Sequence, residues 1–105
     1  MKLALPSLEF QKIIAATSTM EQAQELVIHE VVYDTRKITR TAGVVFFALQ
    51  GPKQNGHAFV QQAYELGIKH FVVEELPVKM HADASYFIVA DALAALQKLA
   101  IYRRS

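Results

Sequence analysis

Two polar loops carry most of the side chains that could take part in chemistry. The first presents an acid, a hydroxyl and a guanidinium in succession, at Asp34, Thr35 and Arg36. Cations, amides and hydroxyls bind phosphates and sugars, and glycines let a ligand approach the backbone closely. The sequence therefore predicts a ligand-binding site, such as a sugar-phosphate cradle, in residues 34–57. The second loop supplies the remaining groups of that site: Gly51, Lys53, Asn55, Gly56 and His57.

Both loops also have a purely structural interpretation. An Asp at the end of a strand commonly forms an Asx-turn, and an exposed Arg is commonly just solvated. Residues 51–56 could be an ordinary turn in which Asn55 caps the next helix, and spacing alone favours that interpretation. The loop matches neither the GxGxxG of dinucleotide-binding proteins nor the GxxxxGK[ST] of a P-loop. ATP therefore has no recognisable cradle in this sequence.

Other kinds of chemistry have little support. The histidines show no HxxxH or HExxH spacing, so the sequence predicts no metal site. The internal serines lack the GxSxG elbow of a hydrolase, and we expect no catalytic residue in this chain. A small hydrolase that uses Asp34 and His57 remains the weakest alternative. The histidines are His29, His57, His70 and His81, and the internal serines are Ser7, Ser18 and Ser85.

Size and composition indicate one globular domain. The chain has 105 residues, of which 52% are hydrophobic and 20% charged, with a formal net charge of +1. This charge is too small to hold a nucleic acid by its overall field. The longest apolar run, residues 43–49, is far shorter than the ~20 residues that span a bilayer. Without cysteines or a signal peptide, the sequence predicts a cytoplasmic protein that binds no membrane.

Hydrophobic patterning predicts an α/β fold. Residues 26–33, 44–49, 71–73 and 86–89 are predicted strands. Helices are predicted to begin at Pro6 or Ser7, to occupy 57–66 with Gly67 as the cap, and to follow Asp91. We expect the last helix to bury one apolar face, made of Ala92, Leu93, Leu96, Leu99 and Ala100.

The segment from residue 44 to 73 runs strand, helix, strand with short connections, which is the pattern of a βαβ unit with parallel strands. In open α/β sheets, ligands bind beyond the carboxyl ends of the strands, where helices begin. Residues 50–56 occupy that position. The fold prediction and the site prediction therefore point to the same edge of the sheet.

The order of these segments resembles the N-terminal domain of the Mur ligases, which add to UDP-N-acetylmuramoyl peptides. The resemblance covers about residues 30–104 and rests on DTRK, the strand GVVFFALQG and the stretch NGHAFVQQAYELGIKHFVVEE. Members of that family typically show an Asp-Ser-Arg triplet, a Leu-Phe-Phe-Ala-Leu type strand and an Asp-Gly-His loop. The resemblance implies a small mixed sheet with a parallel βαβ unit flanked by helices.

The resemblance also implies a function in peptidoglycan precursor synthesis. In the family, this domain binds the UDP end of the substrate, here UDP-N-acetylmuramoyl-tripeptide. ATP and Mg²⁺ act on the central ATP-binding domain of the same polypeptide, so residues 1–105 alone are expected to be inactive. By the same resemblance, the UDP moiety contacts Asp34, Thr35, Arg36, Lys53, Asn55, Gly56 and His57.

Several alternatives stay open within and outside that family. The details are most similar to members that add D-alanyl-D-alanine, including forms fused to alanine racemase. The sister ligases that add the third amino acid share the domain, and a freestanding module for a nucleotide-sugar or a protein is a further alternative. A strong helix directly before the last residue leads us to expect that a longer enzyme continues the chain.

Two departures from the family pattern concern the predicted site. Residues 41–43, Thr-Ala-Gly, replace the usual Pro-Gly turn before the buried strand, and Asn55 stands where Asp is typical. Local hydrogen bonding can differ at both places, but neither change removes donor capacity.

Overall fold

A computed structural model describes residues 1–19, 26–51, 54–78 and 80–104. Its centre is a six-stranded sheet in the order β1-β3-β4-β7-β8-β2. A small second sheet pairs β5 with β6. The strands are β1 (Lys2–Pro6), β2 (Thr17–Ser18), β3 (Val27–Val32), β4 (Val44–Phe47), β5 (Gln50–Gly51), β6 (Gln54–Asn55), β7 (His70–Val73) and β8 (Ser85–Ile88).

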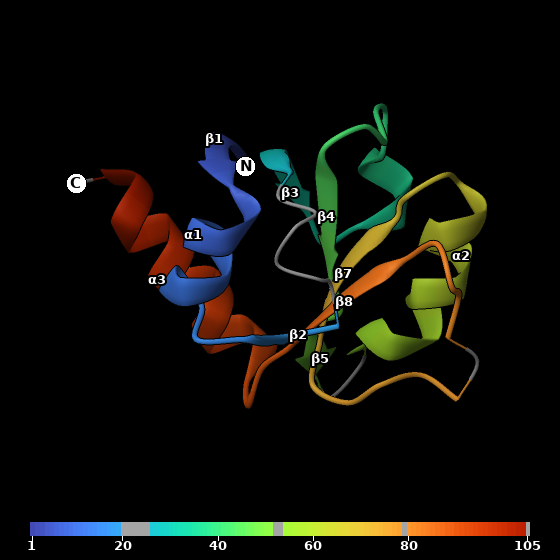
Figure 1. Cartoon of the computed structure of the whole chain (residues 1–105). Coiled ribbons are helices and arrows are strands. Elements are labelled where there is room, and N and C mark those ends of the chain that lie inside the picture. Colours follow the sequence, from blue (N-terminus) through green and yellow to red (C-terminus); the bar gives the residue numbers. More distant parts are fainter. Residues whose placement is uncertain (20–25, 52–53, 79, 105) are drawn as a thin grey trace.

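Helices cover both faces of the large sheet (Figure 1). α1 and α3 pack on one face, and α2 packs on the other. The predicted α/β class and the parallel βαβ unit are confirmed, because β3, β4, β7 and β8 all pair in parallel. The helical segments are α1 (Ser7–Ile13), η1 (Thr35–Lys37), η2 (Gly56–Phe59), α2 (Val60–Glu65) and α3 (Ala92–Arg104), where η marks a 3-10 turn.

The apolar run of β4 is buried on both faces, as its sequence predicts. Val45 and Phe47 belong to the core under α1 and α3, whereas Val44, Phe46 and Ala48 belong to the core under α2. Alternate side chains of a strand point to opposite faces, so a strand covered on both sides must be apolar throughout. This central strand fixes the positions of the loops on either side of it.

Two helix ends follow the predicted local rules. Gly67 has φ +114, its N–H donates to the Tyr64 carbonyl at 3.0 Å, and the Ile68 N–H donates to the Ala63 carbonyl at 3.1 Å. This pattern is the Schellman cap, which glycine favours because it has no Cβ. At the start of α3, the Ala94 N–H donates to Asp91 Oδ1 at 3.0 Å, which confirms the predicted N-cap.

The turn that replaces Pro-Gly keeps the required shape through its glycine. Gly43 has φ +69, and the Val44 N–H donates to the Thr41 carbonyl at 3.3 Å. A Cβ at Gly43 would lie 2.6 Å from Cδ2 of His29. Because only glycine combines this φ with such a close approach, the Thr-Ala-Gly sequence still makes a tight entry into β4.

The structure differs from the sequence predictions at the edges of the sheet and on α3. β1 and β2 pair antiparallel with β3 and β8, although neither was predicted as a strand. β2 has only two residues, and β1 is apolar throughout residues 3–5, so neither shows an alternation of polar and apolar residues. On α3, Ala92, Ala95 and Leu99 are buried, whereas Leu93 is 49% exposed, so its place in the predicted buried face was wrong.

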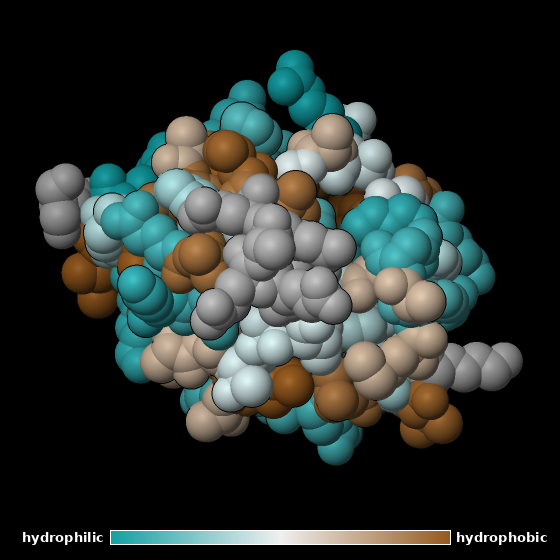
Figure 2. Space-filling view, viewed as in Figure 1, coloured by the Kyte–Doolittle hydropathy of each residue, from teal (hydrophilic) through white to brown (hydrophobic). Residues whose placement is uncertain are grey.

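The exposed surface mixes both kinds of residue. Figure 2 shows hydrophobic residues in small, separate areas among hydrophilic ones on the face viewed. In the parts of the chain that the structure describes, no helix is long and apolar enough to cross a bilayer.

Candidate ligand-binding site

The turn after β3 is built around the carboxylate of Asp34. Oδ1 accepts from the Arg36 N–H at 3.0 Å and from Arg36 Nε at 3.1 Å, while Oδ2 accepts from Nη2 at 3.0 Å. The backbone bond caps η1 and confirms the structural interpretation of Asp34. The two side-chain bonds form a fork between a carboxylate and a guanidinium, which fixes the orientation of both groups.

This pairing changes the titration of both side chains. The hydrogen bonds from Arg36 lower the pKa of Asp34 below its ordinary value of 3.8. In turn, the hydrogen bond to Asp34 raises the pKa of Arg36. The turn therefore keeps a carboxylate and a guanidinium charged at neutral pH. The Arg36 side chain is 84% exposed, so its other N–H groups face solvent where an acceptor can approach.

Thr35 connects this turn to the helix of the βαβ unit. Its hydroxyl lies 3.4 Å from Oε1 of Gln62, on α2. The two residues are 27 positions apart in the sequence, so the fold rather than the local chain brings them together. The first predicted loop is thus placed beside α2, whose N-terminal extension η2 contains the end of the second loop.

A cavity of about 190 Å³ adjoins the turn. Tyr33, Asp34 and Lys37 line it together with Met1 and residues 30–32 of β3. Tyr33 is 57% exposed, and it offers an aromatic ring next to an acid and a cation. Such a combination can stack on a flat base while polar groups bind the base edge.

The second predicted loop leaves β4 at the same edge of the sheet. β5 and β6 pair as Gln50 with Asn55 and Gly51 with Gln54, and η2 then leads directly into α2. The backbone of Asn55, Gly56 and His57 therefore leads into a 3-10 turn, and the α-helix predicted from residue 57 begins only at Val60. Lys53 lies outside the described residues.

The structure brings Asp34, Thr35 and Arg36 together in one turn, and it adds two residues that sequence reasoning missed. Tyr33 was assigned to the strand, because it continues an apolar run. Gln62 falls inside the predicted helix 57–66 and has no distinguishing spacing. Only the packing of α2 beside the turn identifies it, since no local pattern signals a contact over 27 positions.

A second polar cluster lies where β7 and β8 begin, at the opposite edge of the sheet. Asp83 accepts from the Tyr64 hydroxyl and from Lys69 Nζ, both at 2.7 Å. The His81 ring stacks on Tyr64 with centroids 3.5 Å apart, and its Nε2 lies 2.9 Å from Oε1 of Gln61. These bonds tie the connection between β7 and β8 to α2. Within the described ranges, no group of three His, Asp or Glu side chains could hold a metal ion.

Comparison with known proteins gives a consistent picture. A family model described as "Mur ligase family, catalytic domain" matches residues 27–104. The UDP-N-acetylmuramoyl-tripeptide–D-alanyl-D-alanine ligase of Bacillus subtilis is 33% identical over 89 residues, which are 85% of this chain and 19% of that protein. The UDP-N-acetylmuramoyl-L-alanyl-D-glutamate–2,6-diaminopimelate ligase of Bacteroides fragilis is 34% identical over 77 residues, covering 73% of this chain and 16% of the relative.

Solved structures agree with these relatives. A crystal structure of MurF from Acinetobacter baumannii superimposes with a TM-score of 0.81 and 26% identity, and the match covers 98% of this chain and 21% of that protein. A second MurF structure from the same organism gives a TM-score of 0.79 at 25% identity. The chain thus spans about a fifth of the length of the proteins it matches.

Proposed function

The chain belongs to the Mur ligase family, and we propose that it binds the UDP end of UDP-N-acetylmuramoyl-tripeptide within a ligase of peptidoglycan precursor synthesis. The finer activity that we propose for the whole enzyme is the addition of D-alanyl-D-alanine. The observation that carries the proposal is the turn at residues 33–37, which combines an aromatic ring, a hydroxyl and a guanidinium beside the start of α2.

The chemistry of the turn suits a uridine diphosphate. Uracil presents two carbonyl acceptors and a flat ring, and the diphosphate presents anionic oxygens. The exposed N–H groups of Arg36 and the hydroxyl of Thr35 are donors for such acceptors, and the ring of Tyr33 can stack on the base. The helical segment that starts at Gly56 lies at the same sheet edge, where backbone N–H groups favour anions. We therefore keep Asp34, Thr35, Arg36, Asn55, Gly56, His57 and Lys53 as the proposed contacts and add Tyr33 and Gln62.

The chain supplies recognition rather than bond formation in this proposal. ATP and Mg²⁺ would act on the central domain of the same polypeptide, and we assign no step that involves them to residues 1–105. The predicted partners are accordingly the UDP-linked substrate and that central domain. A cytoplasmic location remains a prediction.

An NMR titration of the 105-residue chain with UDP-N-acetylmuramoyl-tripeptide tests the site. We expect shifts in the amides of residues 33–37 and 54–62 and weaker, similar shifts with UDP alone. The Arg36→Ala variant should lose these shifts, whereas Arg40→Ala, which removes an exposed cation outside the turn, should retain them. The site assignment is wrong if millimolar ligand leaves residues 33–37 unchanged.

The sister activity, which adds the third amino acid, is the second candidate, because relatives of that kind match at comparable identity. The UDP end is common to both substrates, so this domain cannot distinguish them by its own contacts. An assay of the whole enzyme with the muramoyl dipeptide and the muramoyl tripeptide decides between them. A freestanding nucleotide-sugar or protein-binding module is a third candidate, and a GTxGKT-like string beyond residue 105 in the gene would rule it out.

A further inference from the structure

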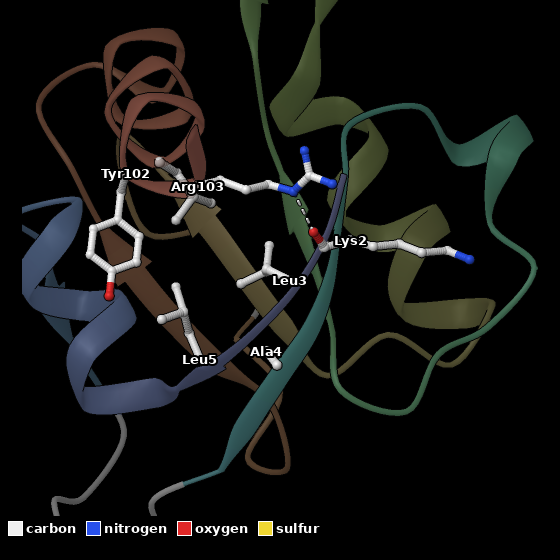
Figure 3. Close-up of a pocket in the computed structure, with 7 residues that line it drawn as sticks. Lys2, Leu3, Ala4, Leu5, Tyr102 and Arg103 are labelled. Carbon is white, nitrogen blue, oxygen red and sulfur yellow. Dashed lines mark hydrogen bonds between the residues drawn. The ribbon is translucent and has the colours of Figure 1, made fainter. Parts of the chain in front are cut away.

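A groove lies between the edge strand β1 and the last turns of α3 (Figure 3). Its volume is about 340 Å³, and residues 2–5, Leu99, Tyr102 and Arg103 line it. Leu5 and Leu99 are buried and give the groove an apolar floor. Arg103 is exposed at its rim, whereas the Lys2 side chain extends away from the groove, on the other side of β1 (Figure 3). The rim therefore carries one cation. No part of the proposed UDP site contributes to this groove.

The outer side of β1 offers backbone groups to a further strand. Among the described residues, β1 pairs with β3 alone. The Met1 carbonyl accepts from the Val31 N–H at 2.8 Å, so it points toward β3. Carbonyls of successive residues in a strand point to opposite sides, which places the Lys2 carbonyl on the outer side. There it accepts from Nε of Arg103 at 2.7 Å, and Figure 3 shows this side chain extending from α3 to the strand.

We propose that this groove binds an extended peptide segment that carries a carboxylate, which adds to the outer edge of β1 as a further strand. A backbone N–H of the peptide would replace Arg103 at the Lys2 carbonyl. The released guanidinium would then bind the carboxylate as a bidentate pair. A partner that has both a backbone N–H and a carboxylate gives new partners to the Lys2 carbonyl and to the Arg103 guanidinium. A partner that has only one of these two groups would leave one hydrogen bond unreplaced.

The shape and charge of the groove support this occupant. In strand addition, backbone bonds supply affinity, and pockets for alternate side chains supply specificity. The floor at Leu5 and Leu99 can accept one apolar side chain of the peptide, and the guanidinium of Arg103 attracts its acid. A basic peptide would face the like charge of Arg103 at the same rim.

In a competing interpretation, Arg103 blocks the edge of β1 against other strands. Proteins often protect edge strands with cationic side chains that keep other chains away. The two interpretations predict opposite results for removal of the guanidinium. If Arg103 only blocks the edge, its loss should increase peptide binding. If Arg103 captures the carboxylate, its loss should weaken binding.

The probe is the synthetic peptide acetyl-Thr-Val-Asp-Val-Thr-amide, titrated into the chain at millimolar concentration and observed by NMR. We expect shifts in residues 2–5 and 99–103. Both Arg103→Ala and Arg103→Glu should weaken binding, the latter by roughly tenfold or more. Lys98→Glu, which changes an exposed cation of α3 outside the groove, should have little effect. The amide spectrum of each variant verifies that the fold is retained.

Two control peptides separate strand addition from simple charge attraction. The same peptide with N-methyl groups on alternate amides lacks strand donors, and the peptide with Lys in place of Asp lacks the carboxylate. We expect neither to bind. The proposal is overturned if the parent peptide causes no shifts, if either control binds as well as the parent, or if Arg103→Ala binds the peptide more tightly than the unmodified chain.

Discussion

Two Asp–cation pairs lie at opposite edges of the sheet, and they differ in how far they reach along the chain. Asp34 and Arg36 are two residues apart and shape a single turn at the carboxyl edge. Asp83 and Lys69 are 14 residues apart at the amino edge, and Tyr64 and His81 extend that pair into a cluster that holds a long connection against α2.

The difference separates the proposed recognition surface from a structural fastening. In the cluster around Asp83, the carboxylate accepts two bonds, and the Lys69 ammonium also lies 4.4 Å from the Tyr64 ring centroid, so its members bind one another. The turn at Asp34 uses only two directions of the Arg36 guanidinium and leaves that side chain 84% exposed. A guanidinium that faces solvent suits a binding site, and side chains that bind one another across 14 or more positions suit a brace.

The helix α2 connects the two regions, so a change in its packing should affect both at once. Ala63 is fully buried between Gln62, which contacts the turn, and Tyr64, which belongs to the cluster. The Ala63→Leu variant should overpack this face and lower the free energy of unfolding by about 1–3 kcal/mol. Urea unfolding measures the loss. Ala58→Leu, the same change at an exposed position, should leave the midpoint nearly unchanged.

Arg36→Ala should affect the carboxyl edge alone. We expect the affinity for UDP-N-acetylmuramoyl-tripeptide to fall roughly ten- to a hundredfold, because a charge-assisted hydrogen bond is lost. Calorimetry or an NMR titration measures this change. Lys69→Ala is the matched control at the amino edge and should leave the affinity unchanged. Equal losses in the two variants would contradict the division between recognition and fastening.

Acid should weaken the ion pair at the amino edge. Hydrogen bonds from Lys69 and Tyr64 lower the pKa of Asp83 from 3.8 to about 2 in the folded protein. The unfolded chain therefore binds a proton more readily, so this contribution to stability is present above pH 3.8 and is lost as the pH falls toward 2. Unfolding measured across this range should show a shallower dependence on pH in the Asp83→Asn variant. An unchanged slope would show that the pair does not act in solution.

His70 should add the smallest effect, in a milder range of pH. Its Nδ1 is buried without a hydrogen-bond partner in the part of the chain that the structure describes, and burial lowers its pKa below 6.5. The unfolded state then takes up a proton first, so stability declines as the pH falls below 6.5. His70→Val should remove this part of the decline, which unfolding at about pH 7.5 and about pH 5.5 measures. The same decline in both proteins would assign it to other groups.

Much of the fold and half of the site could be predicted from local patterns. The run at residues 44–48 is apolar throughout because both faces of β4 are covered, and the cap at Gly67 has a direct conformational cause. Asp34, Thr35 and Arg36 are consecutive in the sequence, so their proximity could be predicted without knowing the fold. Gln62 could not be predicted as their neighbour, because nothing in a helix pattern reports which residue faces a distant turn.

The amino-acid sequence by itself determined the βαβ unit, the caps and the cluster of donors after β3, since each depends on interactions within a few residues. The tertiary structure decided which short segments became edge strands, which side of α2 lies beside Thr35, and how Arg103 reaches the carbonyl of Lys2, 101 positions away. Such contacts depend on how the two helical layers pack on the sheet. Many polar side chains have the same local sequence pattern, and only the packing decides which of them lie close to a distant residue.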